Sequence, residues 1–241
     1  SNFRLTYRTQ PGWTFGANLP YIHRTHEHIH HDAGEDHHER WNDSGLGDIE
    51  LSATRAIVTA SGPRFRVGFG VKAPTGKQDP ALTEDGDPIE ASARLGTGAW
   101  DFLANLGAEW RFRAPGKAAE ETMPLRVTLA GRYNGSGIEE FRHGAEAQVN
   151  LGTEYPLAKH LAVLLQGNYR VRAKDDVGAA EEEEEANTGG VTLYATPGLR
   201  FDAVPGFSIY GLAQFPIYER VNGIQVVAES NLVLGISRSI Y

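Results

Sequence analysis

The stretch WDFLANLGAEWRF at residues 100–112 decides the fold, because its side chains separate by type onto two alternating faces. Every second residue from Trp100 to Phe112 is apolar, and the residues between them are charged, polar or glycine, with Leu103 as the one exception. A period of two residues is typical of a β-strand that has one apolar and one polar face. We therefore predict a two-faced β-strand here.

The same alternation recurs along almost the whole chain. Most of the segments have 10 residues or more, and a tilted strand needs about 9–11 residues to cross a bilayer, whereas strands of soluble proteins usually have about 5–6. We predict a single domain over residues 1–241, an all-β, antiparallel, up-and-down transmembrane β-barrel. The other expected strands are 3–9, 13–27, 48–54, 64–72, 125–135, 144–156, 161–172, 190–202, 207–219 and 225–240.

The connections between these strands alternate between short and long. Tight turns are expected at 10–12, 60–63, 157–160 and 204–206, and long polar loops at 26–44, 78–95 and 175–189. Short periplasmic turns and long extracellular loops are typical of outer-membrane barrels, which usually have an even number of strands. Eleven strands are visible, so we expect about twelve, with one ahead of Ser1. Alternatively, the twelfth strand comes from a turn between Trp13 and His31 that divides the expected strand there into two.

Composition narrows the classes of protein further. The longest apolar runs, such as 161–165, are far shorter than the roughly 20 residues of a membrane helix. With 31 acidic and 23 basic residues, the formal charge of −8 argues against a nucleic-acid partner. There is no cysteine, which fits an oxidising compartment without requiring one. We predict a location in the bacterial outer membrane with lipid as a partner, which requires Ser1 to lie within a processed chain.

Several short segments resemble one known family. The chain resembles the phenol-degradation meta-pathway family of outer-membrane transporters, and the resemblance implies a barrel that moves small, often hydrophobic compounds. Two features depart from the family pattern: the chain ends in Tyr241 where Phe is usual, and the histidine-rich segment is not a family feature. The segments that carry the resemblance, in order, are GLGD at 45–48, VKAPTGK at 71–77, GTGAWD at 96–101, TPGLR at 196–200, QFPIY at 214–218 and VNG at 221–223.

The polar face of the expected barrel carries more cations than anions. These charges must be paired or hydrated, because an isolated charge away from water is costly. Two interpretations stay open: a cation-lined path for anionic or polar solutes, and a ladder of ion pairs that fills the barrel. The residues expected to line the lumen are Asp48, Glu50, Arg64, Arg66, Lys72, Asp101, Glu109, Arg111, Arg126, Arg132, Arg170, Arg172 and Arg200.

Histidines are concentrated in one expected extracellular loop. Imidazole is a good ligand for Zn²⁺, Cu²⁺ and Ni²⁺, and alternate histidines of an extended segment point to one side. The spacing does not match a defined zinc site, so a solvated surface loop is the competing interpretation. No cofactor is required by the predicted function, and the candidate ligands for Zn, Cu or Ni are His26, His28, His30, His31, His37 and His38.

No arrangement of residues identifies an enzyme. His143 and His160 lie outside the histidine-rich loop, and Ser136 is the nearest candidate nucleophile, but no nucleophile motif or acid partner accompanies them. The acidic residues of 78–95 and 175–189 are expected in solvated loops, since no calcium-loop spacing appears. The leading hypothesis is a channel or facilitator for small solutes. The alternatives are a barrel that captures metals and a membrane scaffold for a protein partner.

Overall fold

The computed structural model describes residues 1–9, 12–32, 35–59, 62–84, 86–177, 185–225 and 228–239, and the side chains of 28–39 fall outside this description. The chain forms one antiparallel sheet of 12 strands, which confirms the predicted fold class. The strands are β1 (Asn2–Arg8), β2 (Trp13–Asp32), β3 (Glu35–Leu46), β4 (Ile49–Val58), β5 (Arg64–Ala73), β6 (Asp101–Arg113), β7 (Thr122–Asn134), β8 (Glu146–Ala158), β9 (Leu161–Arg172), β10 (Gly190–Val204), β11 (Phe207–Val221) and β12 (Asn231–Arg238).

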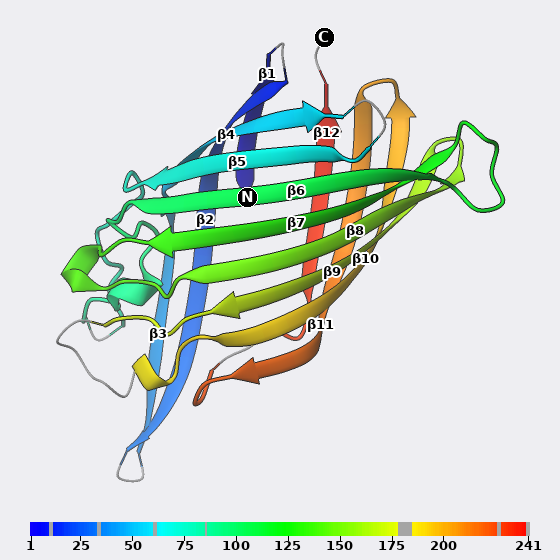
Figure 1. Cartoon of the computed structure of the whole chain (residues 1–241). Helices are drawn as coiled ribbons and strands as arrows, with labels where there is room; N and C mark the ends of the chain where they lie inside the picture. Colours follow the sequence, from blue (N-terminus) through cyan, green and yellow to red (C-terminus); the bar gives the residue numbers. More distant parts are fainter. Residues whose placement is uncertain are drawn as a thin grey trace.

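The wall of the barrel follows the order of the strands in the sequence. Each strand pairs with its neighbour along the path β1-β2-β4-β5-β6-β7-β8-β9-β10-β11-β12, and the sheet curls so that β1 and β12 both lie behind β4–β9 (Figure 1). Among the described residues no ladder joins β1 to β12, so the sheet is curled but not closed. The described helical elements are short: two 3-10 turns, η1 (Ala91–Ala93) and η2 (Ile138–Glu140), and helical residues at 185–186. In the described part of the chain, no helix has the length and apolar character needed to cross a membrane.

The twelfth strand lies in the segment that was expected to be a histidine-rich loop. β3 pairs only with the second half of β2, from Tyr21↔Leu46 to Asp32↔Glu35, while Trp13–Asn18 pair with β4. The two strands form a hairpin that extends beyond the wall (Figure 1). The prediction of a loop without strands at 26–44 is therefore wrong, because β2 continues to Asp32 and β3 begins at Glu35. The segment is mostly polar and lacks the apolar alternation of the wall strands, which is why the sequence indicated a loop. A strand ahead of Ser1 stays a prediction.

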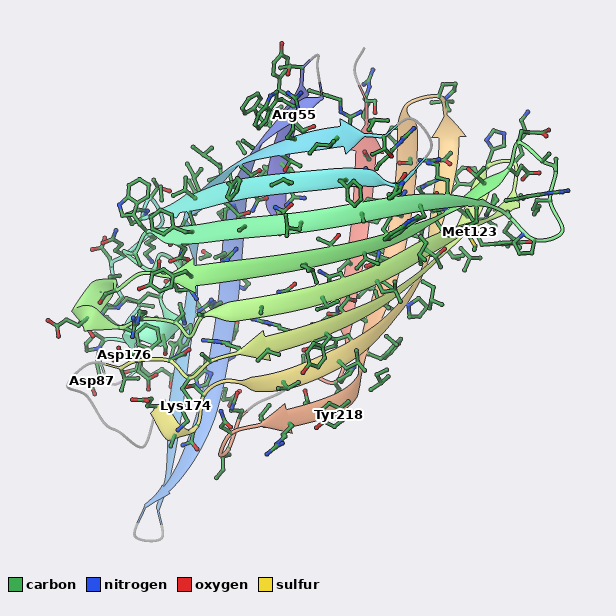
Figure 2. The ribbon with its side chains drawn as sticks, in the orientation of Figure 1. Arg55, Asp87, Met123, Lys174, Asp176 and Tyr218 are labelled. Carbon is green, nitrogen blue, oxygen red and sulfur yellow. The ribbon has the colours of Figure 1, made fainter. Side chains whose placement is uncertain are left out.

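The two ends of the barrel differ, as the lengths of the connections indicate. The loop end carries 74–84, 86–100, 135–145, 173–177, 185–189 and the β2–β3 hairpin, and the turn end is where β1, β4, β8 and β10 end (Figure 1). Asp87, Lys174 and Asp176 lie at the loop end and Met123 at the turn end (Figure 2). The final strand also differs from the prediction, because β12 begins at Asn231 rather than at 225.

Buried apolar side chains are few, and most of them lie at the loop end. There Trp41, Ile89, Leu95, Ala99 and Val177 are buried. Along the wall, large apolar side chains are exposed instead, for example Phe69, Phe102 and Leu234 at 65%, 58% and 75%. A soluble protein rarely exposes so large an apolar surface, so this face needs a nonpolar environment.

Candidate functional site

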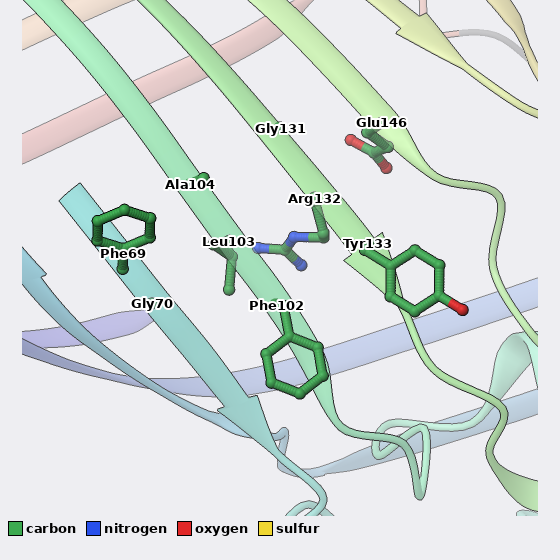
Figure 3. A pocket seen from close by; sticks show the side chains of 9 residues that line it. All are labelled: Phe69, Gly70, Phe102, Leu103, Ala104, Gly131, Arg132, Tyr133 and Glu146. Atoms are coloured by element: carbon green, nitrogen blue, oxygen red, sulfur yellow. The ribbon is translucent and has the colours of Figure 1, made fainter. Parts of the chain in front are cut away.

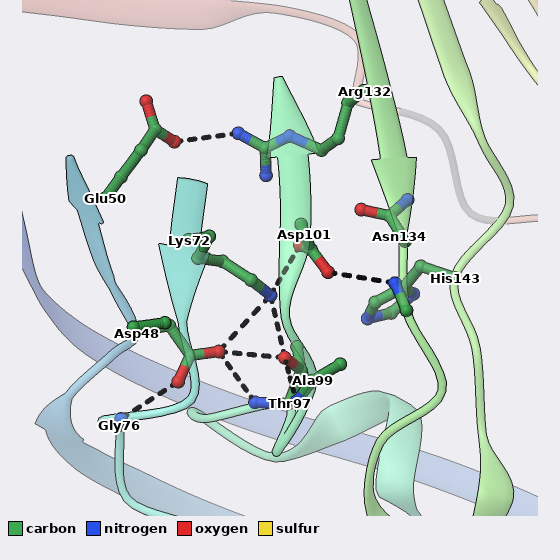
Figure 4. A network of polar contacts seen from close by, with 12 residues as sticks. Asp48, Glu50, Lys72, Gly76, Thr97, Ala99, Asp101, Arg132, Asn134 and His143 are labelled. Atoms are coloured by element: carbon green, nitrogen blue, oxygen red, sulfur yellow. Dashed lines mark hydrogen bonds and ion pairs between the residues drawn. The ribbon is translucent and has the colours of Figure 1, made fainter. Parts of the chain in front are cut away.

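The polar face of the sheet is its concave face. Arg132 on β7 donates to Glu50 on β4 at 2.9 Å, although β5 and β6 lie between these strands (Figure 4). Arg200 on β10 likewise pairs with Glu154 on β8, across β9. Side chains from strands that are not neighbours meet when their face is the inner one of a curled sheet. The alternation in the sequence therefore separates an inner polar face from an outer apolar face.

At the loop end, a buried lysine meets two carboxylates. The Nζ of Lys72, on β5, lies 2.7 Å from Asp101 at the start of β6 and 3.2 Å from Asp48 just ahead of β4 (Figure 4). It also donates to the hydroxyl of Thr97 at 2.7 Å. Asp48 in turn accepts hydrogen bonds from the backbone N–H groups of Gly76 and Thr97, both at 2.9 Å. We call these five residues the lysine network.

The pKa of Asp48 follows from these contacts. Burial opposes the charged form of its carboxyl group, but the hydrogen bonds from Thr97 and Gly76 and the charge of Lys72 outweigh it. The net effect lowers the pKa of Asp48 below its ordinary value. The carboxylate is therefore held in its charged form at the mouth of the barrel.

Three glycines allow the backbone segments to approach one another around this network. A Cβ atom on Gly76 would lie 2.7 Å from the carbonyl carbon of Gly47 and 2.9 Å from the Cα of Gly96. No side chain fits at such distances, so glycine is required where the segments cross. The lysine network therefore joins three of the segments that resemble the phenol-degradation family, 45–48, 71–77 and 96–101.

A second network at the loop end is built on Asp175, just after β9. Its carboxylate accepts hydrogen bonds from Arg172 at 2.6 and 2.7 Å and from the backbone N–H of Gly144 at 2.7 Å. Burial opposes the charged form, but hydrogen bonding by His143 and Gly144 and the charge of Arg172 outweigh it, and the pKa of Asp175 is lowered. Asn134 on β7 completes the contact by donating to the carbonyl of Gly144 at 2.8 Å. The loops after β7 and β9 are thus tied together.

Between the two ends, the inner face carries uncharged polar groups on β8–β11. Asn168 donates to Asn150 at 2.8 Å and accepts a hydrogen bond from Thr196 at 2.8 Å. Gln214 donates weakly to the same oxygen of Asn168 at 3.4 Å. On the opposite part of the wall, a cavity of roughly 280 Å³ is lined mainly by small polar side chains such as Thr6 and Asn18. The middle of the inner face is therefore polar and rich in hydrogen-bonding groups.

At the turn end, three arginines converge on one buried carboxylate. Glu109 on β6 accepts hydrogen bonds from Arg111 at 3.0 Å and from Arg126 at 2.9 Å, and Arg66 lies 3.6 Å away. The Glu109 side chain is 2% exposed, whereas those of Arg66, Arg111 and Arg126 are 47%, 47% and 40% exposed. We call these four residues the arginine cluster. Arg126 also lies 3.6 Å from Glu154.

The structure places the residues that were predicted to line the lumen on this inner face or at its rim, and gives most of them partners. Arg170 pairs with Glu146 at 2.6 Å, and Arg200 pairs with Asp202 at 3.1 Å as well as with Glu154. Arg64 has no ion-pair partner among the described residues. That these side chains line a water-filled path stays a prediction.

Sequence reasoning missed several members of these networks. Thr97 and Asp175 lie in connections, where alternation assigns no face, and Asn168 carries no charge to attract notice. Thr97 does lie in the GTGAWD segment, whose resemblance to the family was the available signal.

The predicted metal ligands gain no support from the described residues. His26 stacks on Trp41 with 5.3 Å between the ring centroids. The side chains of His28, His30, His31, His37 and His38 lie outside the described residues. Within the described part of the chain, no three His, Cys, Asp or Glu side chains are grouped to hold a metal ion. Binding of Zn, Cu or Ni stays an untested prediction.

Among the described residues, no hydrogen bond joins the candidate nucleophile Ser136 to His143 or His160. The hydroxyl of Ser136 donates to the carbonyl of Glu140 at 3.0 Å. His143 instead contacts Arg172 at 3.1 Å, and His160 contacts the carbonyl of Asp202 at 2.9 Å, at the turn end. The two histidines therefore belong to separate structural networks.

The wall of β5–β7 has a hollow of about 470 Å³ on its outer face. Phe69, Phe102 and Tyr133 flank Ala104 and Gly131, whose small size leaves the hollow (Figure 3). The backbone of the wall continues beneath it, since Ala104 and Gly131 are paired residues of β6 and β7. The hollow is thus a depression in the apolar face.

Comparison with known proteins agrees with this architecture. The fold is similar to the crystal structure of an outer-membrane channel from Pseudomonas putida F1, with a TM-score of 0.64 and 12% sequence identity over 98% of this chain and 80% of that chain. Among curated proteins, none matches the sequence significantly. A family model does match, over residues 31–220, and confirms the resemblance drawn from the short segments. The chain therefore belongs to the family described as "Putative MetA-pathway of phenol degradation".

Proposed function

We propose that this protein is an outer-membrane channel or facilitator that carries small anionic or polar solutes through a cation-lined lumen. The location is supported by the exposed apolar outer face, by strands of 10 residues or more such as β6 and β10, and by the similarity in fold to an outer-membrane channel. The strands alternate between an apolar and a polar face, as lipid outside and water inside require.

The observation that carries the choice of solute is the arginine cluster. Three arginine side chains remain 40–47% exposed while the one carboxylate that they share is 2% exposed. A solute that passes the turn end therefore meets cations before it meets the anion. Rings of arginine or lysine in a pore favour anions, because the unneutralised charge attracts them and repels cations.

A hydrophobic phenol-like solute fits this inner face poorly. Guanidinium groups can stack on its aromatic ring, but a neutral solute brings no charge to pair with the surplus of cations and would displace the water that hydrates them. We therefore favour anionic and polar solutes over neutral hydrophobic ones, within a family whose description refers to phenol degradation.

Measurement of ion selectivity in planar lipid bilayers tests this function. The purified protein, folded in detergent and inserted into the bilayer, is expected to conduct, and a gradient of KCl is expected to give a reversal potential of the sign for chloride preference. The variant Arg66→Gln/Arg126→Gln/Arg200→Gln should lower that preference, with wild-type protein from the same preparation as the control. A folded protein without current, or with preference for potassium, would contradict the proposal.

A further inference from the structure

We infer that Arg66, Arg111 and Arg126 form a binding site for an oxyanion group of the solute, and that Glu109 is the residue that positions them and limits the affinity. The inference rests on the proposed channel function and adds to it the chemical class of the solute and the place where it binds. The site lies at the turn end of the inner face, on β5, β6 and β7.

The geometry leaves most guanidinium nitrogens of the site available. Each guanidinium group carries five N–H donors. Glu109 accepts hydrogen bonds from the Nε of Arg111 and the Nε of Arg126, and one terminal nitrogen of Arg66 lies 3.6 Å from it. One further nitrogen of Arg126 lies 3.6 Å from Glu154. The remaining donors have no described protein partner, and the exposure of the three side chains means that a solute can reach them.

The balance of charge also favours a further anion. Three cations share Glu109, and Glu154 is divided between Arg126 and Arg200. Arg64, which has no ion-pair partner among the described residues, lies opposite Glu109 in the β5–β6 register. The site therefore holds a surplus of positive charge that the described residues do not neutralise.

The class of anion follows from the geometry of the guanidinium groups that supply the donors. A guanidinium group forms two parallel hydrogen bonds with a carboxylate or phosphate group, which a spherical chloride ion cannot accept in the same way. Carboxylates, phosphates and sulfonates should therefore bind more tightly than chloride. They should occupy the site and slow the chloride current.

Glu109 has two roles in this arrangement. It holds the three guanidinium groups beside one another, because its two oxygens accept hydrogen bonds from Arg111 and Arg126 and its charge lies 3.6 Å from Arg66. Its negative charge also opposes an incoming oxyanion, and a transported solute must bind weakly enough to leave. Glu109 is thus a positioning residue that keeps the site from trapping its solute.

The inference is tested by block of the chloride current with two probes, inorganic phosphate and benzoate. We expect both to reduce the current of the wild-type protein in a saturable manner. Arg111→Gln, which removes one guanidinium group, should raise the half-blocking concentration several-fold. Glu109→Gln should lower it about fivefold, the effect of one charge removed at close range in a hydrated site. Arg66→Gln is a second variant for the case in which a Glu109 variant does not fold.

Arg132→Gln is the matched control, because Arg132 is an inner-face arginine with a single carboxylate partner at the loop end. Equal shifts in Arg111→Gln and Arg132→Gln would mean that the whole lumen attracts anions and would overturn the site. Weaker block in Glu109→Gln would overturn the limiting role of Glu109. Failure of the proposed function looks different, since the wild-type protein would then carry no current or would prefer cations.

Discussion

The lysine network at the loop end and the arginine cluster at the turn end use the same chemistry with opposite balance. In the first, two carboxylates surround one cation. Asp48 also accepts hydrogen bonds from the backbone N–H groups of Gly76 and Thr97, and Asp101 accepts one from that of Gly135. In the second, three cations surround one carboxylate, and they remain exposed. In each cluster the single residue of opposite charge, Lys72 in the first and Glu109 in the second, is buried. Of these two clusters, only the arginine cluster has exposed donors without a partner among the described residues, so the lysine network is structural and the arginine cluster is suited to recognition.

The largest effect on stability should come from removing the buried cation. Lys72→Met leaves Asp48 and Asp101 without their counter-charge, and breaking a buried ion pair by removing one partner costs about 3–5 kcal/mol. Urea unfolding in phospholipid vesicles, followed by tryptophan fluorescence, measures this loss. Arg66→Gln is the control from the turn end and should cost less than about 1 kcal/mol, because its side chain is half exposed. Equal losses in the two variants would remove the distinction between the ends.

Thr97→Val should have a smaller effect at the same network. The substitution keeps the shape of the side chain but removes the hydroxyl that bonds Lys72 and Asp48. Hydrogen bonds to charged groups contribute about 1.5–3 kcal/mol each, and partial replacement by water should leave a loss of about 2 kcal/mol. The same unfolding assay measures it, and Thr97→Ser, which keeps the hydroxyl, is the matched control. A loss as large in Thr97→Ser would contradict the assignment to the hydroxyl.

Stability should fall at acidic pH through the loop-end carboxylates. The pKa values of Asp48 and Asp175 are lowered in the folded protein, so each contributes stability above the ordinary aspartate value of about 4, and this contribution is lost as the pH falls through the folded pKa. The free energy of unfolding should therefore be level from neutral pH to about pH 5 and decrease below it. The unfolding assay repeated across pH measures this profile.

Asp48→Asn supplies the control for this dependence on pH. It cannot titrate, so its profile should be less steep in the acidic range than that of the wild-type protein. Stability that rises as the pH falls would contradict the sign of both pKa shifts.

The smallest effect is expected for the pair that joins β4 to β7. Arg132 and Glu50 are 34% and 24% exposed, and an ion pair with this access to water contributes less than about 1 kcal/mol. A double-mutant cycle of Arg132→Gln and Glu50→Gln measures the coupling free energy. A coupling as large as the loss expected for Lys72→Met would contradict the small contribution expected of an exposed pair.

Much of the fold could be predicted from the sequence, because alternation is a local property of an extended backbone. Successive side chains of a strand point to opposite faces, so the pattern of 100–112 gives both the strand and its faces without knowledge of any partner. The strand predicted at 13–27 is the first part of β2, but the end of β2 and the whole of β3 escaped this reasoning, since their polar sequence carries no apolar alternation. The pairing Tyr21↔Leu46 depends on a contact between distant residues.

The candidate site, like the fold, could be predicted from the sequence only in part. The sequence by itself determined which charged residues share a face, and thus that Arg66, Glu109 and Arg126 could meet. It did not determine which cation would lie against which carboxylate, because that depends on strand register and on the curl of the sheet. Only the tertiary structure brought Arg132 to Glu50 across two strands and gave Glu109 three arginines. The sequence thus determined the two faces, and the packing of the strands decided which charges were paired and which stayed exposed.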